Sequence, residues 1–370
     1  MLTLARGAFW LVAVVAMILA AGCGANPNAG SAASNSVSGE KSVGAANGRL
    51  VLLMNGNSPF WDAVRAGMQR AADELGVNAV LETNDATPNG QITSLRQFGT
   101  QSDILAVAIS VTDAANVAIA DEMRKLKAKG VHVITIDSDV DRQRLRDARF
   151  AFIGTDNLVG GRELGTAARH LRPDGGAFVT FVGRTGAQNA IERVGGFVEG
   201  AGDTLRAIDN MGDENDRTRA KENVRNAIRN HPELNVLVGI WSYNAPAIVD
   251  VVRELGVRHK FSVVAFDAEP IAVAQMNAGD IDAMVVQNPF EMGYQGVRLM
   301  KALVEDDQST IHEMFPRHGE AEGDVYDTGL KVVVPDERST LSADVFGPKT
   351  QFLKLSEFRR WLDEYGLKGS

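Results

Sequence analysis

The sequence predicts an α/β protein with two similar lobes, each built on a parallel β-sheet. Short, continuously apolar runs alternate with amphipathic stretches along most of the chain, and the alternation restarts after residues 154–161. A parallel strand buried on both faces requires such an apolar run, and a helix carries the chain to the next parallel strand. No close sequence repeat relates the two halves, so this prediction depends on the pattern alone.

Four strands are expected in the first half, at residues 50–54, 80–81, 104–110 and 131–136. A helix is expected to begin at Ser58 and Pro59, because serine caps helix N-termini and proline suits the first turn. Apolar side chains follow at helical spacing, and Gly76 is expected to end this helix. A second helix is expected over residues 114–128.

In the second half, strands are expected at residues 177–182, 234–240, 262–266, 281–286 and 331–334. Helices are expected over residues 190–200, 247–254 and 290–304. A last helix is expected to begin at Ser356 and to end at Gly366, with Leu367 folding back in a Schellman motif.

The N-terminal segment resembles a bacterial lipoprotein signal. Residues 9–21 are almost wholly apolar after Arg6, and Leu-Ala-Ala-Gly precedes Cys23. The run is short for a transmembrane helix. The resemblance to a lipobox implies cleavage after residue 22 and lipidation of Cys23, although Ala20 stands where the family more often has leucine. An ordinary secretory signal is the alternative, and both predict export.

Composition narrows the classes of partner. Residues 24–48 are mostly Gly, Ala, Ser and Asn, which predicts a flexible tether over residues 23–48. Cys23 is the only cysteine, so no disulfide is expected, and a body of this length needs none. The net charge of −9 argues against nucleic acid as a partner.

Polar and aromatic residues gather directly after the expected strands, where open parallel sheets bind ligands. These residues are Asn55, Asn57, Phe60, Trp61, Ser110, Asp137, Ser138, Asp139, Trp241, Tyr243, Phe266, Asp267, Gln287 and Asn288. Carboxylates and amides pair with sugar hydroxyls, and an aromatic ring covers the apolar C–H face of a sugar. The set is poor in nucleophiles and metal ligands, so the pattern predicts binding of a sugar or polyol.

Residues 49–334 resemble the periplasmic sugar-binding proteins of ABC importers, in their ribose-binding-like branch. Five motifs carry the resemblance: Asn57 to Trp61, Val133 to Asp137, Gly154 to Asn157, Asn189 to Phe197 and Val264 to Asp267. Each motif is weak alone, and their order and spacing make the match specific.

The resemblance implies the type I periplasmic binding protein fold, with two Rossmann-like lobes joined by three hinge crossings. The N-terminal lobe would comprise residues 49–156 and 287–328, and the C-terminal lobe residues 157–286. Residues 329–370 would supply the last hinge strand and a C-terminal extension.

The resemblance also implies a ligand site between the lobes. Its residues would be Asn57, Phe60, Trp61, Ser110, Asp137, Asp139, Arg193, Trp241, Asp267 and Gln287. Phe60 and Trp61 would sandwich the sugar ring, and Gln287 would sit at a hinge. Arg193 has a structural alternative, as a partner of Glu192 or Asp203.

Three departures set this site apart from ribose binders of the branch. Ser138 and Asp139 follow Asp137 where the branch has an arginine, and Ser110 and Trp241 each stand in place of an asparagine. The ligand is therefore expected to be a monosaccharide or related polyol, and the resemblance to ribose binders does not identify it as ribose.

The expected function is capture of this ligand and its delivery to an ABC permease, by a protein anchored to a bacterial membrane through its lipid. Presentation of the ligand to a histidine kinase or chemoreceptor is the alternative. Glycoside hydrolysis by Asp137 and Asp267 is disfavoured, because binding hydroxyls needs the same carboxylates. No cofactor or metal is expected, since the six histidines lack metal-ligand spacing and residues 84–90 lack a calcium loop.

Overall fold

The computed structural model describes residues 48–370. The expected signal peptide (residues 1–22), the lipidated Cys23 and the tether up to residue 47 lie outside the described residues. Within residues 48–370, no helix is both long enough and apolar enough to cross a membrane.

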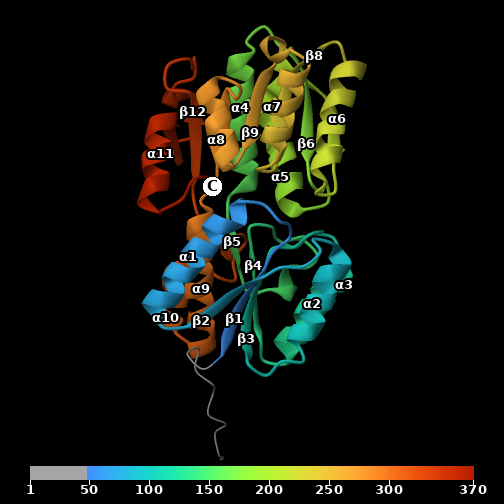
Figure 1. Cartoon of the computed structure of the whole chain (residues 1–370). Coiled ribbons are helices and arrows are strands. Elements are labelled where there is room, and N and C mark those ends of the chain that lie inside the picture. The colour runs from blue at the N-terminus through green and yellow to red at the C-terminus, as the bar shows by residue number, and fades with distance from the viewer. Residues whose placement is uncertain (1–47) are drawn as a thin grey trace, which may run out of the picture. The chain divides into compact units, whose positions relative to one another are not determined.

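Two sheets organise the described chain (Figure 1). The first has the order β11-β5-β4-β3-β1-β2 and the second the order β13-β12-β10-β9-β8-β6-β7. The strands of the first sheet are β1 (Arg49–Leu53), β2 (Asn78–Glu82), β3 (Ile104–Ile109), β4 (His132–Ile136), β5 (Phe152–Gly154) and β11 (Val325–Asp327). Those of the second are β6 (Gly176–Val182), β7 (Leu205–Gly212), β8 (Leu234–Gly239), β9 (Ser262–Phe266), β10 (Ala283–Val286), β12 (Leu330–Val334) and β13 (Thr350–Lys354). Neighbouring strands run parallel except β10 and β12, which are antiparallel.

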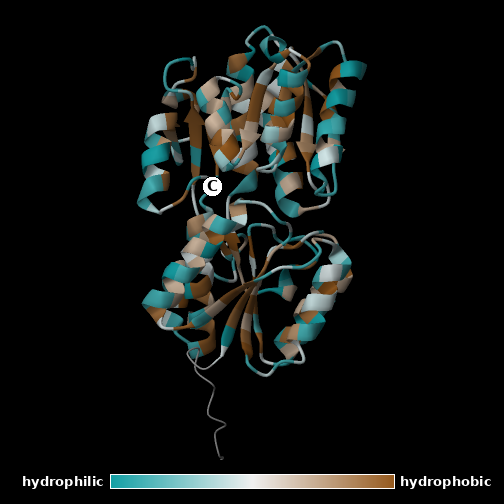
Figure 2. Ribbon diagram, in the orientation of Figure 1, coloured by the Kyte–Doolittle hydropathy of each residue, from teal (hydrophilic) through white to brown (hydrophobic). Residues whose placement is uncertain are grey.

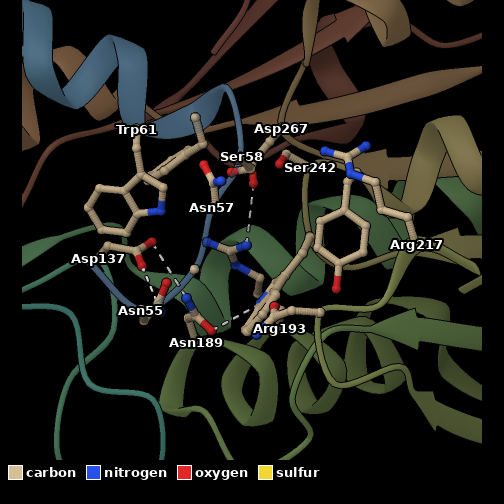
Figure 3. A pocket seen from close by; sticks show the side chains of 15 residues that line it. Asn55, Asn57, Ser58, Trp61, Asp137, Asn189, Arg193, Arg217, Ser242 and Asp267 are labelled. Atoms are coloured by element: carbon tan, nitrogen blue, oxygen red, sulfur yellow. Dashed lines mark hydrogen bonds and ion pairs between the residues drawn. The ribbon is translucent and has the colours of Figure 1, made fainter. Parts of the chain in front are cut away.

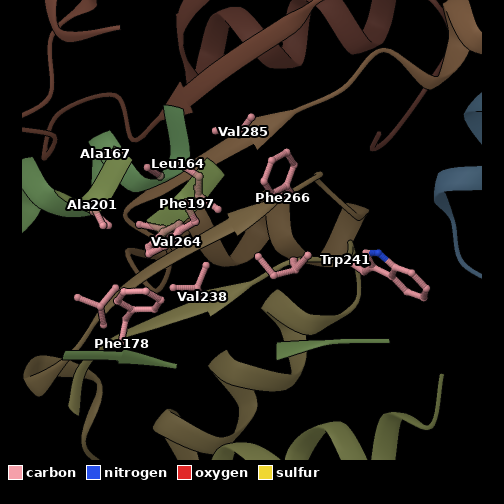
Figure 4. Close-up of a cluster of buried hydrophobic side chains, with 14 of the residues drawn as sticks. Leu164, Ala167, Phe178, Phe197, Ala201, Val238, Trp241, Val264, Phe266 and Val285 are labelled. Atoms are coloured by element: carbon pink, nitrogen blue, oxygen red, sulfur yellow. The ribbon is translucent and has the colours of Figure 1, made fainter. Parts of the chain in front are cut away.

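Helices cover both faces of each sheet, so the central strands are mostly apolar (Figure 2). The first lobe contains α1 (Phe60–Leu75), α2 (Pro88–Phe98), α3 (Val117–Ala128), α9 (Pro289–Glu305) and α10 (Gln308–Met314). The second contains α4 (Asn157–Leu171), α5 (Gln188–Ala201), α6 (Arg217–Asn230), α7 (Asn244–Glu254), α8 (Pro270–Ala278) and α11 (Leu355–Glu364). Figure 4 shows one resulting core, in which the rings of Phe178 and Phe197 pack against each other, Phe266 belongs to the same cluster, and Trp241 lies at its edge.

The chain passes between the lobes three times. It leaves the first sheet after β5, returns between β10 and α9, and crosses again between β11 and β12. The α/β fold predicted from the sequence, with two lobes and three crossings, is confirmed.

Several elements differ from the sequence-based expectation. The expected serine caps are wrong: Pro59 occupies the N-cap of α1 without a side-chain bond, and α11 begins before Ser356, where the Glu357 carboxylate accepts the Lys354 N–H at 2.8 Å. The Schellman ending is confirmed, because Leu367 N–H donates to the Leu362 carbonyl at 2.9 Å. Edge strand β7 was not predicted, since its exposed residues show neither an apolar run nor a clean alternation.

Glycines let two pairs of helices approach backbone to backbone. Gly67 of α1 and Gly293 of α9 meet in the first lobe, where a Cβ on Gly293 would lie 2.0 Å from the Val64 carbonyl oxygen. In the second lobe, a Cβ on Gly196 of α5 would lie 2.2 Å from the Leu158 oxygen of α4. Both contacts involve backbone, so they fix α1 and α5 against their neighbours.

We expect Gly196→Ala to lower the free energy of unfolding by about 1 to 3 kcal/mol, because the added methyl group forces α4 and α5 apart. The adjacent Gly195→Ala is the matched control, since a Cβ there meets nothing within 4 Å. That variant should be as stable as the wild type or up to about 1 kcal/mol more stable, through higher helix propensity. Urea unfolding of both variants measures the difference, and equal effects would contradict the close-packing argument.

Candidate ligand-binding site

A cavity of about 510 Å³, its opening to solvent included, lies between the lobes at the carboxyl ends of the strands. The cavity is lined by Asn55, Gly56, Asn57, Ser58, Phe60, Trp61, Asp137, Asn189, Arg193, Asn215, Arg217, Trp241, Ser242, Tyr243 and Asp267 (Figure 3).

Asp137 presents its carboxylate from the first lobe. It follows β4 directly and has φ 61°, a left-handed conformation that is uncommon for aspartate. Its backbone N–H donates to the Ile153 carbonyl at 3.1 Å, so the next strand holds this turn. Ser110 Oγ donates to Asp137 Oδ2 at 2.7 Å, and the amide of Asn55 lies 3.4 Å from the same oxygen.

Asp267 occupies the equivalent place in the second lobe. It follows β9 directly, has φ 62°, and its N–H donates to the Val285 carbonyl at 2.8 Å. Gln287 Nε2 donates to Asp267 Oδ1 at 2.8 Å. Each lobe therefore turns one buried carboxylate into the cavity by the same device, a left-handed residue at the end of a parallel strand.

Arg193 of α5 is the cation between these carboxylates. Its side chain is 1% exposed, and its Nη1 lies 3.7 Å from Asp267 Oδ2. Nε donates to Asn157 Oδ1 at 2.9 Å and Nη1 to the Ile240 carbonyl at 3.0 Å, while the guanidinium lies 4.4 Å from the Phe266 ring centre. Nη2 is buried and finds no hydrogen-bond partner within residues 48–370. The structural alternative, a pair with Glu192 or Asp203, is not what the described residues show.

Burial dominates the protonation of both carboxylates. It raises the pKa of Asp267 to about 6, against the opposing effect of Arg193. Burial also raises the pKa of Asp137, where Arg193 and the Ser110 hydroxyl oppose it. The two carboxylates repel each other, which contributes to the shift of Asp267.

Aromatic rings enter the cavity from both lobes. Phe60 and Trp61 open α1 with their rings 5.4 Å apart at 86°. From the second lobe, Trp241 donates its indole N–H to Asn189 Oδ1 at 3.2 Å, and its ring covers Gly183, where a Cβ would lie 2.1 Å away. The indole orientation is therefore fixed by both a hydrogen bond and packing.

Seven of the ten predicted ligand-binding residues line this cavity: Asn57, Phe60, Trp61, Asp137, Arg193, Trp241 and Asp267. Ser110 and Gln287 do not line it, but each donates a hydrogen bond to one of the two cavity aspartates. The prediction that Asp139 lies in the ligand site is corrected, because Asp139 does not line the cavity. Its carboxylate accepts two hydrogen bonds from Arg149 instead, each 2.7 Å long. A pattern of residues after strands does not say which of two alternating aspartates faces the ligand.

The sequence-based prediction missed Asn215, Arg217 and Ser242 in the cavity wall. Asn215 and Arg217 follow the unpredicted strand β7, so no expected strand end pointed to them. Arg217 Nη2 donates to Glu269 Oε1 at 3.1 Å, and its guanidinium lies 5.1 Å from the Tyr243 ring centre. Asn189 begins one of the five motifs that carry the family resemblance. That motif and its place at the start of α5 could have identified Asn189 as a cavity residue.

The family described as a periplasmic binding protein domain matches residues 49–308. The chain belongs to this family. The D-allose-binding periplasmic protein of Escherichia coli K12 is 24% identical over 256 residues, which cover 68% of this chain and 82% of that protein. The ribose import binding protein RbsB of the same strain is 24% identical over 244 residues, covering 65% and 79%.

Solved structures show the same fold. A solute-binding protein of an ABC transporter from Burkholderia graminis C4D1M, in complex with D-arabinose, has a TM-score of 0.70 at 24% identity, covering 80% of this chain and 99% of that one. GanP, a glucose-galactose binding protein from Geobacillus stearothermophilus, has a TM-score of 0.67, covering 78% and 97%. These relatives are binding proteins, in agreement with the expectation that the chain is not an enzyme.

The C-terminal residues of this periplasmic binding protein pack against the loop that follows β9, which the sequence did not indicate. Ser370 and Ala268 exchange two backbone hydrogen bonds, of 2.8 and 2.6 Å, next to Asp267. Ser370 Oγ also donates to the Gln287 carbonyl at 3.3 Å. Gly369 packs so closely that a Cβ would lie 2.5 Å from the Ala268 oxygen. The tail therefore supports the loop that carries one cavity carboxylate.

Asp267→Asn tests the protonation of the cavity. The folded-state pKa of about 6 lies above the ordinary value of 3.8, so the folded protein binds the proton more tightly. Its contribution to stability is therefore lost as pH rises from about 4 to about 6. Because asparagine lacks this loss, we expect the variant to gain on the order of 2 kcal/mol relative to wild type between pH 4 and pH 7. Urea unfolding at both pH values measures this gain, with Asp174→Asn on an exposed turn as control. Parallel pH profiles for Asp267→Asn and wild type would refute it.

Gly369→Val tests the tail. The side chain would collide with the backbone at Ala268 and Pro270, so we expect the tail to detach and the Asp267 loop to loosen. Faster amide hydrogen exchange at residues 267–269, with little change in β1–β4, is the expected result. Lys368→Ala removes an exposed side chain beside it and should leave the exchange unchanged. Unaltered exchange in Gly369→Val would show that the loop holds without the tail.

Proposed function

We propose that this protein captures a monosaccharide or related polyol between its two lobes and delivers it to an ABC permease. The observation that carries the proposal is the pair of buried carboxylates, Asp137 and Asp267, which face one cavity around Arg193. Carboxylates accept hydrogen bonds from adjacent hydroxyls, and the free Arg193 Nη2 donates to a hydroxyl or ring oxygen. A polyhydroxylated ligand supplies both kinds of partner.

The aromatic residues support the same class of ligand. Trp61 and Trp241 offer large rigid apolar surfaces beside the polar groups, which suits a molecule with hydroxyl edges and C–H faces. We propose as ligand contacts the seven predicted residues that line the cavity, with Ser110 and Gln287 orienting the two aspartates. The relatives point the same way, since their names specify D-allose, ribose and D-arabinose.

A thermal-shift screen of the purified protein against pentoses, hexoses and polyols tests ligand capture. A ligand at about a hundred times its dissociation constant should add roughly 2.7 kcal/mol to the free energy of unfolding. We expect Asp137→Asn to weaken the binding of any hit by about 10- to 100-fold, because the amide presents one acceptor oxygen instead of two. Asp174→Asn should bind normally. A hit that binds Asp137→Asn at full strength lies outside this cavity, and the absence of any hit contradicts the ligand class.

Delivery and anchoring have their own tests. Uptake of the identified sugar by the source cells should be lost on deletion of the gene and restored by wild type but not by Asp137→Asn. Cys23→Ala should release the protein from the membrane fraction if the expected lipid is attached there. Uptake that survives the deletion would favour presentation to a sensor instead.

A further inference from the structure

A network of charged side chains in the first lobe extends across the edge of the cleft to the second lobe. Its fixed part is Arg149, fully buried between Asp139 and Asp324. Arg149 donates to both oxygens of Asp139, and Thr135 Oγ1 donates to Asp139 Oδ1 at 2.6 Å. Burial raises the pKa of Asp139, but Arg149, Arg142 and the Thr135 hydroxyl together outweigh burial, and the pKa lies below its usual value. Asp139 is therefore an ionised, immobile acceptor.

Arg142 uses this acceptor to project toward the other lobe. Its Nε donates to Asp139 Oδ2 at 2.8 Å, and its guanidinium lies 4.9 Å from the Phe152 ring centre. These two contacts orient the guanidinium, which leaves Nη1 free to reach outward. Nη1 lies 3.3 Å from Oε1 of Glu192 in the second lobe.

Contacts within the second lobe orient Glu192 toward Arg142. It lies on α5 beside Arg193, and Gln188 Nε2 donates to its Oε1 at 2.9 Å, one turn earlier in the helix. The lobes also touch nearby, where the Ala114 N–H donates to the Gly186 carbonyl at 3.1 Å. Arg142 and Glu192 thus form an ion pair between the lobes, and each side chain is oriented by contacts within its own lobe.

We propose that Arg142 and Glu192 form a latch that stabilises the closed arrangement of the lobes without touching the ligand. Asp139 is its positioning residue, which gives a role to a predicted site residue that faces away from the cavity. Parting the lobes breaks the Arg142–Glu192 pair but none of the bonds inside the first lobe. The latch therefore biases the equilibrium between open and closed forms. The proposal extends the proposed function, because closure matters only if a ligand is held.

The side chains of Arg142 and Glu192 are 27% and 17% exposed, so solvent and salt weaken the pair only in part. We expect Arg142→Gln and Glu192→Gln each to raise the dissociation constant of a bound sugar by about 2- to 10-fold. The increase should appear in the rate of dissociation, because the pair forms after the lobes have met. The effect should shrink at high salt.

The experiment is a double-mutant cycle with two readouts. Arg142→Gln, Glu192→Gln and the double variant are compared for ligand dissociation rate and for radius of gyration by small-angle X-ray scattering, with and without sugar. Arg144→Gln is the matched control: Arg144 lies in the same segment, and within residues 48–370 its only ion pair is with Asp141 of its own lobe, at 2.6 Å. Glu192→Gln keeps an acceptor for Gln188, so it removes the interlobe charge without changing α5.

The latch predicts that the second substitution adds little once the first is made, and that both single variants scatter as a more open molecule than the control. Additive effects, or single variants that match Arg144→Gln in both readouts, would overturn it. Thermal unfolding shows whether Arg142→Gln acts by destabilising its own lobe, and Glu192→Gln is free of that ambiguity. Scattering without sugar reports on the latch even if no sugar binds, so its failure is distinguishable from failure of the proposed function.

Discussion

The buried guanidinium of Arg193 is the interaction on which the candidate site depends. It is held in the second lobe by Asn157 and the Ile240 carbonyl, and it offsets the charge of Asp267 and, through space, that of Asp137. A charged group this deeply buried is costly unless it is paired. Arg193 therefore offsets part of the cost of placing two carboxylates in one cavity, and its Nη2 has no hydrogen-bond partner within residues 48–370.

Close helix packing places this charge. Glycines let α5 lie directly on α4, which fixes the height of Arg193 above the second sheet, and the equivalent crossing of α1 and α9 fixes Trp61 above the first. The carboxylates come from the sheets instead, through a left-handed aspartate at the end of β4 and of β9. Each lobe thus contributes one closely packed helix and one aspartate in a left-handed conformation at the end of a strand. Under the proposed function, a ligand that bridges the lobes contacts groups that are held firmly within each lobe, so we expect recognition and closure to be coupled.

The charged residues Asp139, Arg149 and Asp324 form a second buried network, which does not face the cavity. Asp139, Arg149 and Asp324 are buried within the first lobe, where their mutual bonds survive any movement of the lobes. Arg142 extends that network outward, and the C-terminal tail braces the Asp267 loop from the other side. The cavity is therefore supported by residues remote from it in sequence, from the segment after β4 and from the end of the chain.

The sequence by itself determined the central strands, the alternation that makes two lobes, and most cavity residues, because buried parallel strands must be apolar and ligands bind at their carboxyl ends. It could not supply β7 or the loop with Asn215 and Arg217, since an exposed edge strand carries no apolar run. It could not separate Asp137 from Asp139, whose difference arises from one left-handed backbone angle and from Arg149. Only the tertiary structure decided these points, together with the placement of Ser370 beside Ala268, because they depend on contacts between segments that no local pattern specifies.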